Sequence, residues 1–370
     1  MNNASEWYSI TNVDELETPG LVLYPDRIRS NIIAAIGMVP DIAQLRPHVK
    51  THKLREVATM MLEEGITKFK CATIAEAEML AMQKAPDVLI AYQPVGPNVY
   101  RFRQLVSRYR ETNFSCIVDS INCAEQINDV FADEHLRPQV YMDINVGMNR
   151  TGVLPKHAIE LYKQLKNLSH CEIVGIHAYD GHIVDSPLSV RKQKADEVFS
   201  YIEDICKAIQ ALDRSTVSVV IGGTPTFPVH LHRKNVELSP GTFVFWDHGY
   251  SDLYPEMPFQ YAALLVGRVI SIVNEKIICL DIGYKSVASE KPLPRMRFLN
   301  ATSALPIAHS EEHLVVQVAD TTNVREGEVW FAVPTHICPT VALFEKVAII
   351  RNNEVSGYWN VIARKRKINI

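Results

Sequence analysis

The sequence predicts an α/β fold: a TIM-type (β/α)8 barrel followed by a C-terminal antiparallel β-domain. Two observations lead to this prediction. From about Asp26 to Tyr250, helix-like segments alternate with short apolar runs, which is the pattern of a parallel sheet. After Tyr250 the segments are rich in strand-forming residues, with no good helix pattern between them. A doubly wound open sheet is the alternative for the first region.

Length and composition indicate an ordinary globular protein with more than one domain. The chain has 370 residues, of which 47% are hydrophobic and 22% are charged, and its net charge is −4. We therefore expect neither a nucleic acid nor a membrane surface as a partner. The first residues have neither the basic start nor the apolar core of a signal peptide. Seven cysteines without a repeating spacing argue against a disulfide framework and favour a reducing cytoplasm.

The alternation in the first region gives eight strands for the barrel. Seven are expected at residues 45–50, 68–73, 88–92, 114–119, 139–145, 173–179 and 217–222. The eighth is expected at 236–238, and residues 243–246 compete for that place. Helices are expected at residues 26–36, 53–64, 74–83, 99–110, 122–131, 155–167 and 190–212. Eight such units over this length suit a closed barrel.

The second region predicts a separate antiparallel sandwich or barrel. Its strands are expected at residues 264–273, 276–281, 314–318, 328–333, 346–351 and 357–363. Asn274-Glu275 and Asn352-Asn353 look like hairpin turns. The boundary is expected near residues 251–258, which gives a barrel domain of residues 15–250 and a β-domain of residues 251–370. Residues 1–14 are assigned to the β-domain, and residues 7–16 are expected to add a strand to it.

The first expected strand carries a candidate catalytic lysine, Lys50. Alternation of side chains puts Arg46, His48 and Lys50 on one face of this strand. Basic groups on a buried face are unfavourable unless something anionic lies against them. A lysine at the end of such a strand is a candidate Schiff-base nucleophile, because burial favours the neutral amine. The alternative is a solvated basic turn that leads into a helix.

Two glycine–threonine loops follow the seventh and eighth expected strands, where a barrel binds phosphate. They contain Gly222-Gly223-Thr224 and Gly241-Thr242. Backbone N–H groups without side-chain bulk, together with a hydroxyl, make a compact anion site. Taken alone, such clusters are usually turns. A lysine and a phosphate site in one barrel mouth indicate pyridoxal 5′-phosphate (PLP).

Three further residues follow predicted strand ends. Arg150 is placed near the cofactor ring or the substrate carboxylate, although most arginines at such rims pair with a carboxylate. Tyr179 is expected to pack near the cofactor, with a core aromatic as the alternative. His182 is a candidate general base because its ordinary pKa is suitable, although such a histidine is more often a surface residue.

The β-domain contains Pro334-Thr335-His336-Ile337-Cys338-Pro339. His336 and Cys338 are two apart at the end of an expected strand, so both side chains can point the same way. An imidazole and a thiolate suit Zn²⁺, with manganese as the alternative divalent metal. Two protein ligands leave positions open, as in a catalytic site. The alternative is a buried cysteine beside an incidental histidine.

Taken together, these motifs resemble the D-threonine aldolase/D-serine dehydratase family over nearly the whole chain. The motifs that carry the resemblance are Thr18-Pro19-Gly20-Leu21-Val22-Leu23, Arg46-Pro47-His48-Val49-Lys50-Thr51-His52-Lys53, Cys71-Ala72-Thr73-Ile74-Ala75-Glu76-Ala77-Glu78, Tyr179-Asp180-Gly181-His182, Gly222-Gly223-Thr224-Pro225-Thr226 and His336-Ile337-Cys338. The resemblance implies the fold-type III architecture of alanine racemase, with a PLP barrel, a β-domain and a homodimer.

The resemblance also implies roles for individual residues. Lys50, rather than Lys53, would be the Schiff-base lysine. The other expected cofactor-binding residues are His48, Arg150, Tyr179, Gly222, Gly223, Thr224, Gly241 and Thr242. His336 and Cys338 would bind a divalent metal near the 3-hydroxyl of the substrate. Ser239 is a departure, because alanine racemase has an arginine there that faces the pyridine nitrogen.

The expected function is a PLP- and metal-dependent lyase that acts on D-3-hydroxy amino acids. Dehydration of D-serine is favoured because a thiolate at Cys338 resembles the dehydratase branch. The alternative is a D-threonine aldolase, which releases glycine and an aldehyde. Lys50 is the expected base at Cα, with His182 as the alternative. An amino-acid racemase has no use for the metal pair, and a non-catalytic PLP-binding protein resembles the barrel alone.

Overall fold

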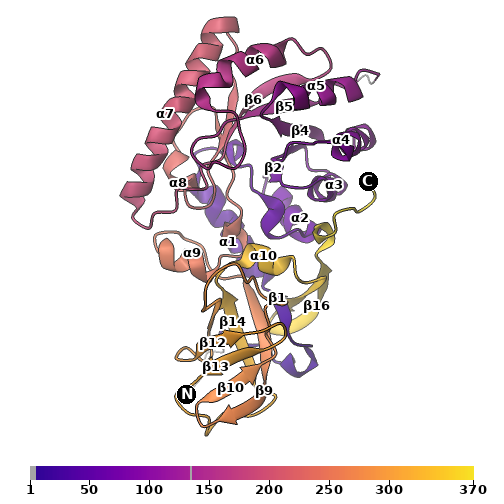
Figure 1. Cartoon of the computed structure of the whole chain (residues 1–370). Coiled ribbons are helices and arrows are strands. Elements are labelled where there is room, and N and C mark those ends of the chain that lie inside the picture. Colours follow the sequence, from indigo (N-terminus) through magenta and orange to yellow (C-terminus); the bar gives the residue numbers. More distant parts are fainter. Residues whose placement is uncertain (1–5, 134–135) are drawn as a thin grey trace. The chain divides into compact units, whose positions relative to one another are not determined.

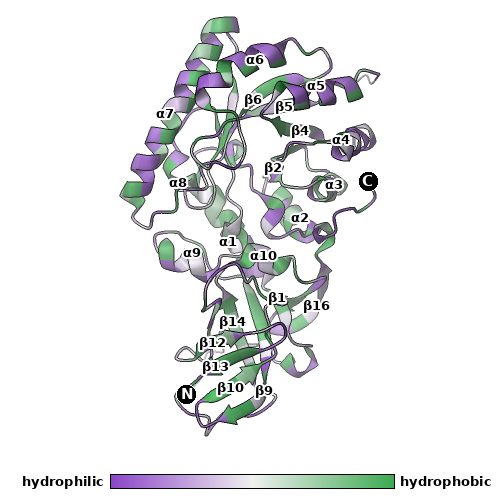
Figure 2. Cartoon of the chain, viewed as in Figure 1, coloured by the Kyte–Doolittle hydropathy of each residue, from purple (hydrophilic) through white to green (hydrophobic). Residues whose placement is uncertain are grey.

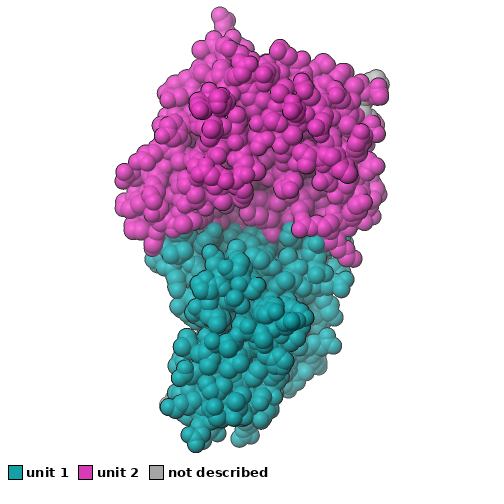
Figure 3. Space-filling model, viewed as in Figure 1, with its two compact units in different colours: residues 1–34, 51–57, 242–364 teal, residues 35–50, 58–241, 365–370 magenta. Residues whose placement is uncertain are grey.

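The structure is a computed structural model that describes residues 6–133 and 136–370. The chain divides into two compact units (Figure 3). The parallel-sheet unit contains residues 35–50, 58–241 and 365–370. The mixed-sheet unit contains residues 1–34, 51–57 and 242–364. Each unit has a sheet of its own, so each is described separately.

Seven parallel strands form the sheet of the first unit, in the order β2-β3-β4-β5-β6-β7-β8 (Figure 1). They are β2 (Lys68–Cys71), β3 (Asp87–Ile90), β4 (Asn113–Val118), β5 (Gln139–Asp143), β6 (Glu172–Ala178), β7 (Ser218–Ile221) and β8 (Val236–Leu238). Strand order follows chain order, as expected for right-handed βα units. The predicted α/β class is therefore confirmed, but the predicted closed barrel of eight strands is not, because the parallel sheet of the described chain has seven strands and is not fully closed. The last strand, β8, forms at residues 236–238 rather than at 243–246, where a short 3-10 turn lies instead.

Helices follow most of these strands, and α3 to α7 lie along the outside of the sheet in Figure 1. The helices of the first 241 residues are α1 (Pro25–Met38), α2 (Arg55–Glu63), α3 (Ile74–Met82), α4 (Pro97–Arg108), α5 (Ile121–Val130), α6 (Ala158–Lys166), α7 (Leu188–Asp213) and α8 (Phe227–His230). Helix α3 illustrates how a local sequence motif begins a helix. Thr73 caps its first turn by accepting from the backbone N–H of Glu76, and the Glu76 carboxylate accepts from the N–H of Ala72.

The strand expected at residues 45–50 does not form. Leu45 and His48 make single parallel bridges, to Leu238 of β8 and to Lys70 of β2. Pro47 has no N–H to donate to a ladder, and Val49–Thr51 winds into a 3-10 turn. The segment therefore contacts both edge strands of the seven-stranded sheet, and Lys50 lies in a turn rather than at a strand end.

Arg46 of this bridging segment is fully buried and has two acidic partners. Its Nε lies 2.5 Å from Glu237 Oε2, and its Nη1 lies 2.5 Å from Asp87 Oδ1. Lys68 pairs with the second oxygen of Glu237 at 2.5 Å. Glu237 of β8 and Asp87 of β3 therefore supply the negative charge that the buried Arg46 requires.

The second unit holds a nine-stranded sheet that is mixed rather than antiparallel. Its strands are β1 (Gly20–Leu23), β9 (Ala263–Asn274), β10 (Ile277–Leu280), β11 (Met296–Phe298), β12 (Leu305–His309), β13 (Leu314–Gln317), β14 (Val329–Pro334), β15 (Lys346–Arg351) and β16 (Glu354–Asn360). The prediction of a purely antiparallel sheet was wrong because β1, from the start of the chain, pairs in parallel with β15. Apolar residues are concentrated on these strands in Figure 2.

Several local expectations for this unit also change. Residues 7–16 form no strand within the described chain; Tyr8, Ile10 and Leu16 pack into the core instead. One short helix, α10 (Ile337–Val341), interrupts the β-rich region, and another, α9 (His248–Leu253), precedes its first strand. The turn at Asn352-Asn353 has positive φ at both residues, as a type I′ hairpin requires.

Two findings concern the whole described chain. None of the helices in residues 6–133 and 136–370 combines the length and the apolar character needed to cross a membrane. All seven cysteines are free thiols.

Replacing Arg46 by methionine should strongly destabilise the parallel-sheet unit. The change keeps much of the side-chain volume but leaves Glu237 and Asp87 without their shared cation. Removing one partner of a buried ion pair costs about 3–5 kcal/mol in free energy of unfolding. Urea unfolding followed by circular dichroism measures this loss. The control is Lys207→Met, which removes an exposed pair with Asp204. A loss for Arg46→Met as small as that of the control would contradict the assignment.

Candidate active site

A cavity of about 550 Å³ lies at the ends of the strands of the parallel-sheet unit. This volume is within the range of about 300–1,000 Å³ that is typical of small-molecule sites. Four of the predicted site residues line the cavity, namely His48, Lys50, Arg150 and Tyr179. The structure therefore brings together residues from the bridging segment, from the loop after β5 and from the end of β6.

The ring of Tyr179 lines this cavity and lies near two of its cations. Lys50 Nζ lies 5.7 Å from the ring centroid, and Arg150 Cζ lies 5.2 Å from it. Cations at such distances are attracted by the negative face of an aromatic ring. Two glycines leave room for the ring: a Cβ atom at Gly181 would lie 2.3 Å from it, and one at Gly223 would lie 3.3 Å from it. The position of Tyr179 therefore depends on these small residues.

The glycine–threonine loops after β7 and β8 contact one another. The N–H of Gly241 donates to Thr224 Oγ1 at 3.1 Å. Gly222 has φ +79°, a backbone conformation that glycine adopts readily. The N–H of Gly223 donates to Thr226 Oγ1 at 3.1 Å. The bond to Thr224 joins the two loops, and the bond to Thr226 closes the turn after β7.

The buried carboxylate of Asp180 holds the turn after β7 in place. Thr226 donates to Asp180 Oδ1 at 2.9 Å, and the second oxygen of Asp180 lies 2.8 Å from His230 Nε2. The buried hydroxyl oxygen of Ser239 has no hydrogen-bond partner among the described residues. Buried polar atoms are normally paired, so this hydroxyl is available to a bound polar group. The loops therefore fit an anion such as phosphate.

The mixed-sheet unit contains the His336–Cys338 pair. Cys338 Sγ lies 3.1 Å from Thr51 Oγ1 and 3.4 Å from Thr242 Oγ1. His336 contacts the Glu290 carboxylate through Nδ1. The prediction that both residues lie at the end of a strand was wrong. Strand β14 ends at Pro334, and His336 occupies the N-cap position of the short helix α10. The turn between strand and helix, rather than strand alternation, brings imidazole and thiol together.

The two side chains stabilise each other's charged forms. Burial alone would lower the pKa of His336, but the Cys338 thiolate and Glu290 raise it to about 9. Burial would likewise raise the pKa of Cys338, but hydrogen bonding to His336 and its positive charge lower it. A nitrogen and a sulfur donor suit Zn²⁺. No cluster of three or more His, Cys, Asp or Glu ligands occurs in the described chain, so a cation here would keep positions open.

The predicted residues His182 and Thr242 are not among the described residues that line the Lys50 cavity. His182 is exposed, and its ring lies against Gly147, where a Cβ atom would come within 2.8 Å of His182 Nε2. Thr242 belongs to the mixed-sheet unit, where its hydroxyl contacts Cys338.

A buried group of three polar residues in the cavity was not among the predicted site residues. Lys70 Nζ lies 3.2 Å from His177 Nε2, and His177 Nδ1 lies 2.6 Å from Asp143 Oδ1. All three residues are buried, and all three line the cavity. One signal was present in the sequence, since Lys70 is a charged residue between Phe69 and Cys71 in an otherwise buried strand.

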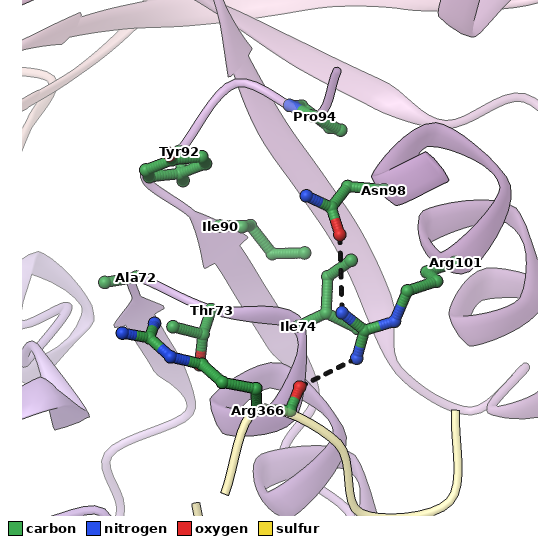
Figure 4. A pocket seen from close by; sticks show the side chains of 9 residues that line it. All are labelled: Ala72, Thr73, Ile74, Ile90, Tyr92, Pro94, Asn98, Arg101 and Arg366. Atoms are coloured by element: carbon green, nitrogen blue, oxygen red, sulfur yellow. Dashed lines mark hydrogen bonds between the residues drawn. The ribbon is translucent and has the colours of Figure 1, made fainter. Parts of the chain in front are cut away.

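A second cavity of about 330 Å³ adjoins the first and shares Ala72 and Tyr92 with it (Figure 4). Arg101 and Arg366 line it, and none of the described residues around it is acidic. Arg101 is fixed by its own bonds, because Nη2 donates to the main-chain oxygens of Arg366 and Ile370 at 2.9 and 2.8 Å. This cavity therefore presents positive charge beside the Lys50 cavity.

Comparison with protein families gives two matches along the chain. Residues 24–248 match the model of the alanine racemase N-terminal domain. Residues 262–350 match the model described as a putative serine dehydratase domain. The first match alone covers more than half of the chain.

Individual relatives cover nearly all of it. The chain is 26% identical over 361 residues to a D-threonine aldolase from Arthrobacter sp, covering 94% of this chain and 93% of the relative. It is 22% identical to the D-serine dehydratase of Dictyostelium discoideum, covering 92% and 95%. Among solved structures, the D-threonine aldolase of Filomicrobium marinum superposes with a TM-score of 0.88 at 24% identity, covering 97% of this chain and 98% of the other.

Proposed function

Because the chain belongs to the D-threonine aldolase/D-serine dehydratase family of alanine racemase-like enzymes, we propose that it is a lyase that acts on D-3-hydroxy amino acids with PLP and a divalent metal. The observation that carries the proposal is the cavity in which Lys50, Arg150 and Tyr179 meet beside the glycine–threonine loops. The homodimer and the cytoplasmic location expected from the sequence are part of the same proposal.

The residues of the parallel-sheet unit fit PLP. Lys50 offers the amine that would hold it, and Tyr179 offers an aromatic face. The loops that contain Gly222, Gly223 and Gly241 would hold its phosphate through the hydroxyls of Thr224 and the unpaired Ser239. Once bound, PLP stabilises negative charge at Cα of an amino acid. His48 accepts from the backbone N–H of Lys50 at 3.3 Å and so orients the turn that carries the lysine.

The donor set of the mixed-sheet unit fits a divalent metal, with zinc preferred over manganese. His336 and Cys338 would hold it, and Glu290 would orient the imidazole through Nδ1. Such an ion polarises a hydroxyl group and helps it leave. Thr51 and Thr242 hold the thiol sulfur in place through their hydroxyl groups.

Dehydration is the reaction that we favour. Lys50 would accept the proton from Cα, and loss of the 3-hydroxyl as water would then lead to a keto acid and ammonia. His182, the alternative base, is exposed and lies outside the lining of the cavity. The thiolate ligand also resembles the dehydratase branch. Aldol cleavage to glycine and an aldehyde is the second candidate, because a D-threonine aldolase is among the relatives that cover most of the chain.

The side chain of the substrate would extend toward the second cavity. Arg101 and Arg366 there favour a negatively charged group, so a substrate with a second carboxylate, such as 3-hydroxy-D-aspartate, fits best. Uncharged substrates such as D-serine and D-threonine would make no use of this positive charge.

Product analysis tests the proposal directly. The purified enzyme, supplied with PLP and Zn²⁺, is incubated separately with D-serine, D-threonine and 3-hydroxy-D-aspartate. We expect a keto acid and ammonia, with the highest kcat/KM for 3-hydroxy-D-aspartate. Glycine and an aldehyde as the main products would replace dehydration by aldol cleavage. Turnover of none of the three, with the L-enantiomers equally inert, would contradict the lyase assignment.

The visible absorption band of bound PLP should depend on Lys50. Lys50→Ala should abolish this band because it removes the amine that is proposed to hold the cofactor covalently. The matched control is Lys53→Asn, since Lys53 has φ +55° and asparagine tolerates that conformation. Absorbance of the dialysed proteins measures the effect. A band that survives in Lys50→Ala but disappears in Lys53→Asn would move the role to Lys53.

Metal removal should separate the two sites. Chelation should abolish activity while the PLP band persists, because the metal donors and the cofactor lysine are different residues. Cys338→Ala should lower the zinc content of the protein, measured by mass spectrometry of the metal, by more than tenfold. Cys206→Ala, which changes a partly buried cysteine on helix α7, should leave it unchanged. Full activity after chelation would exclude the metal role.

A further inference from the structure

Lys70 is a buried amine that the proposed function leaves without a role. Its side chain lines the same cavity as Lys50, and the residue is only 2% exposed. Its Nζ lies 5.3 Å from the centroid of the Tyr179 ring. Within the described chain no carboxylate lies within ion-pair distance of this amine. A permanently charged ammonium in such a place would be strongly unfavourable.

The hydrogen bonds around Lys70 run in one direction. Asp143 can only accept when it is ionised, so His177 donates to it from Nδ1. Nε2 of a neutral His177 then accepts from Lys70 Nζ at 3.2 Å. Burial and the charge of Lys70 lower the pKa of His177, which keeps the ring neutral. The His177–Asp143 pair therefore holds Nζ in place through one hydrogen bond. The other hydrogen-bonding positions of Nζ remain for a ligand in the cavity.

The charged groups around Lys70 oppose one another. Burial lowers the pKa of Lys70 to about 7, and the positive charges of Lys50 and Arg46 act in the same direction. Asp143 and Asp180 act in the opposite direction. An additional negative charge placed in the cavity would therefore shift this balance toward the ammonium form.

We propose that Lys70 is a switchable cation of this cavity, which takes up a proton when an anionic cofactor binds and which His177 and Asp143 hold in position. The inference rests on the proposed function only in the identity of the ligand, PLP. The step is a simple proton transfer from solvent: one N–H bond forms at Nζ, and nothing is oxidised or reduced. Lys70 thereby neutralises part of the ligand's charge without leaving an unpaired charge in the ligand-free protein.

The sign of the pH dependence follows from this shift. An anionic ligand raises the pKa of Lys70 above its ligand-free value of about 7. The contribution to binding is then complete below pH 7, where Lys70 is already protonated. It is lost as the pH rises through the pKa of the bound state. Between these two pKa values the affinity should fall by up to about tenfold per pH unit.

Titration calorimetry tests the proposal. PLP is added to the apo-protein at pH 7.5 in two buffers with different heats of ionisation, which yields the number of protons taken up. Comparison of the wild type with Lys70→Met cancels the protons that belong to PLP and Lys50. We expect the wild type to take up about 0.5–1 proton more than Lys70→Met, as linkage requires for one group. Circular dichroism checks that the variant is folded.

Two further variants sharpen the test. Lys68→Met alters the same strand, but Lys68 pairs with Glu237 and does not line the cavity, so its proton uptake should equal that of the wild type. Asp143→Asn removes a charge that favours the ammonium form, so the fall in affinity should begin at a lower pH. Equal proton uptake in the wild type and Lys70→Met would overturn the inference, even though PLP binds. Failure of the wild type to bind PLP would instead contradict the proposed function.

Discussion

Positive charge buried inside the parallel sheet must be balanced, and this requirement organises the interior of that unit. Arg46 is balanced by Glu237 and Asp87, which close the gap between the bridging segment and strands β8 and β3. Lys70 is balanced only indirectly, through the neutral ring of His177. Lys50, which is partly exposed, faces the cavity without a carboxylate beside it in the described contacts. The basic groups thus differ: Arg46 pairs with two carboxylates, whereas Lys50 is available for a ligand.

Shape imposes a second constraint on the same cavity. The ring of Tyr179 occupies the space that side chains at Gly181 and Gly223 would fill. The same loop after β7 is tied through Thr226 to the buried Asp180. One tyrosine position therefore depends on the conformation of two loops, and one of them, the loop after β7, is also proposed to hold phosphate. Aromatic packing and anion binding are in this way set by a single piece of local structure.

The sequence predicted what depends on local pattern. Alternation of apolar runs and amphipathic segments located β2 to β8 and the helices between them, because burial imposes those periods directly. It failed for residues 45–50, where Pro47 breaks the ladder although the side-chain pattern is that of a strand. It also failed for β1, whose parallel partner β15 lies more than 300 residues away. Lys70 and His177 are 107 residues apart, so their contact could not be read from spacing.

Chain connectivity explains why the predicted motifs contain both residues of the lysine cavity and residues that contact the Cys338 sulfur. Lys50 and Thr51 are consecutive, and so are Gly241 and Thr242. In each pair the first residue belongs to the lysine cavity or its loops, and the second contacts the sulfur of Cys338. A change in backbone conformation at either peptide bond therefore affects the amine or the anion site together with the thiol. The short motif around Lys50 was informative for this reason: it carries parts of two chemical sites within a few bonds of each other.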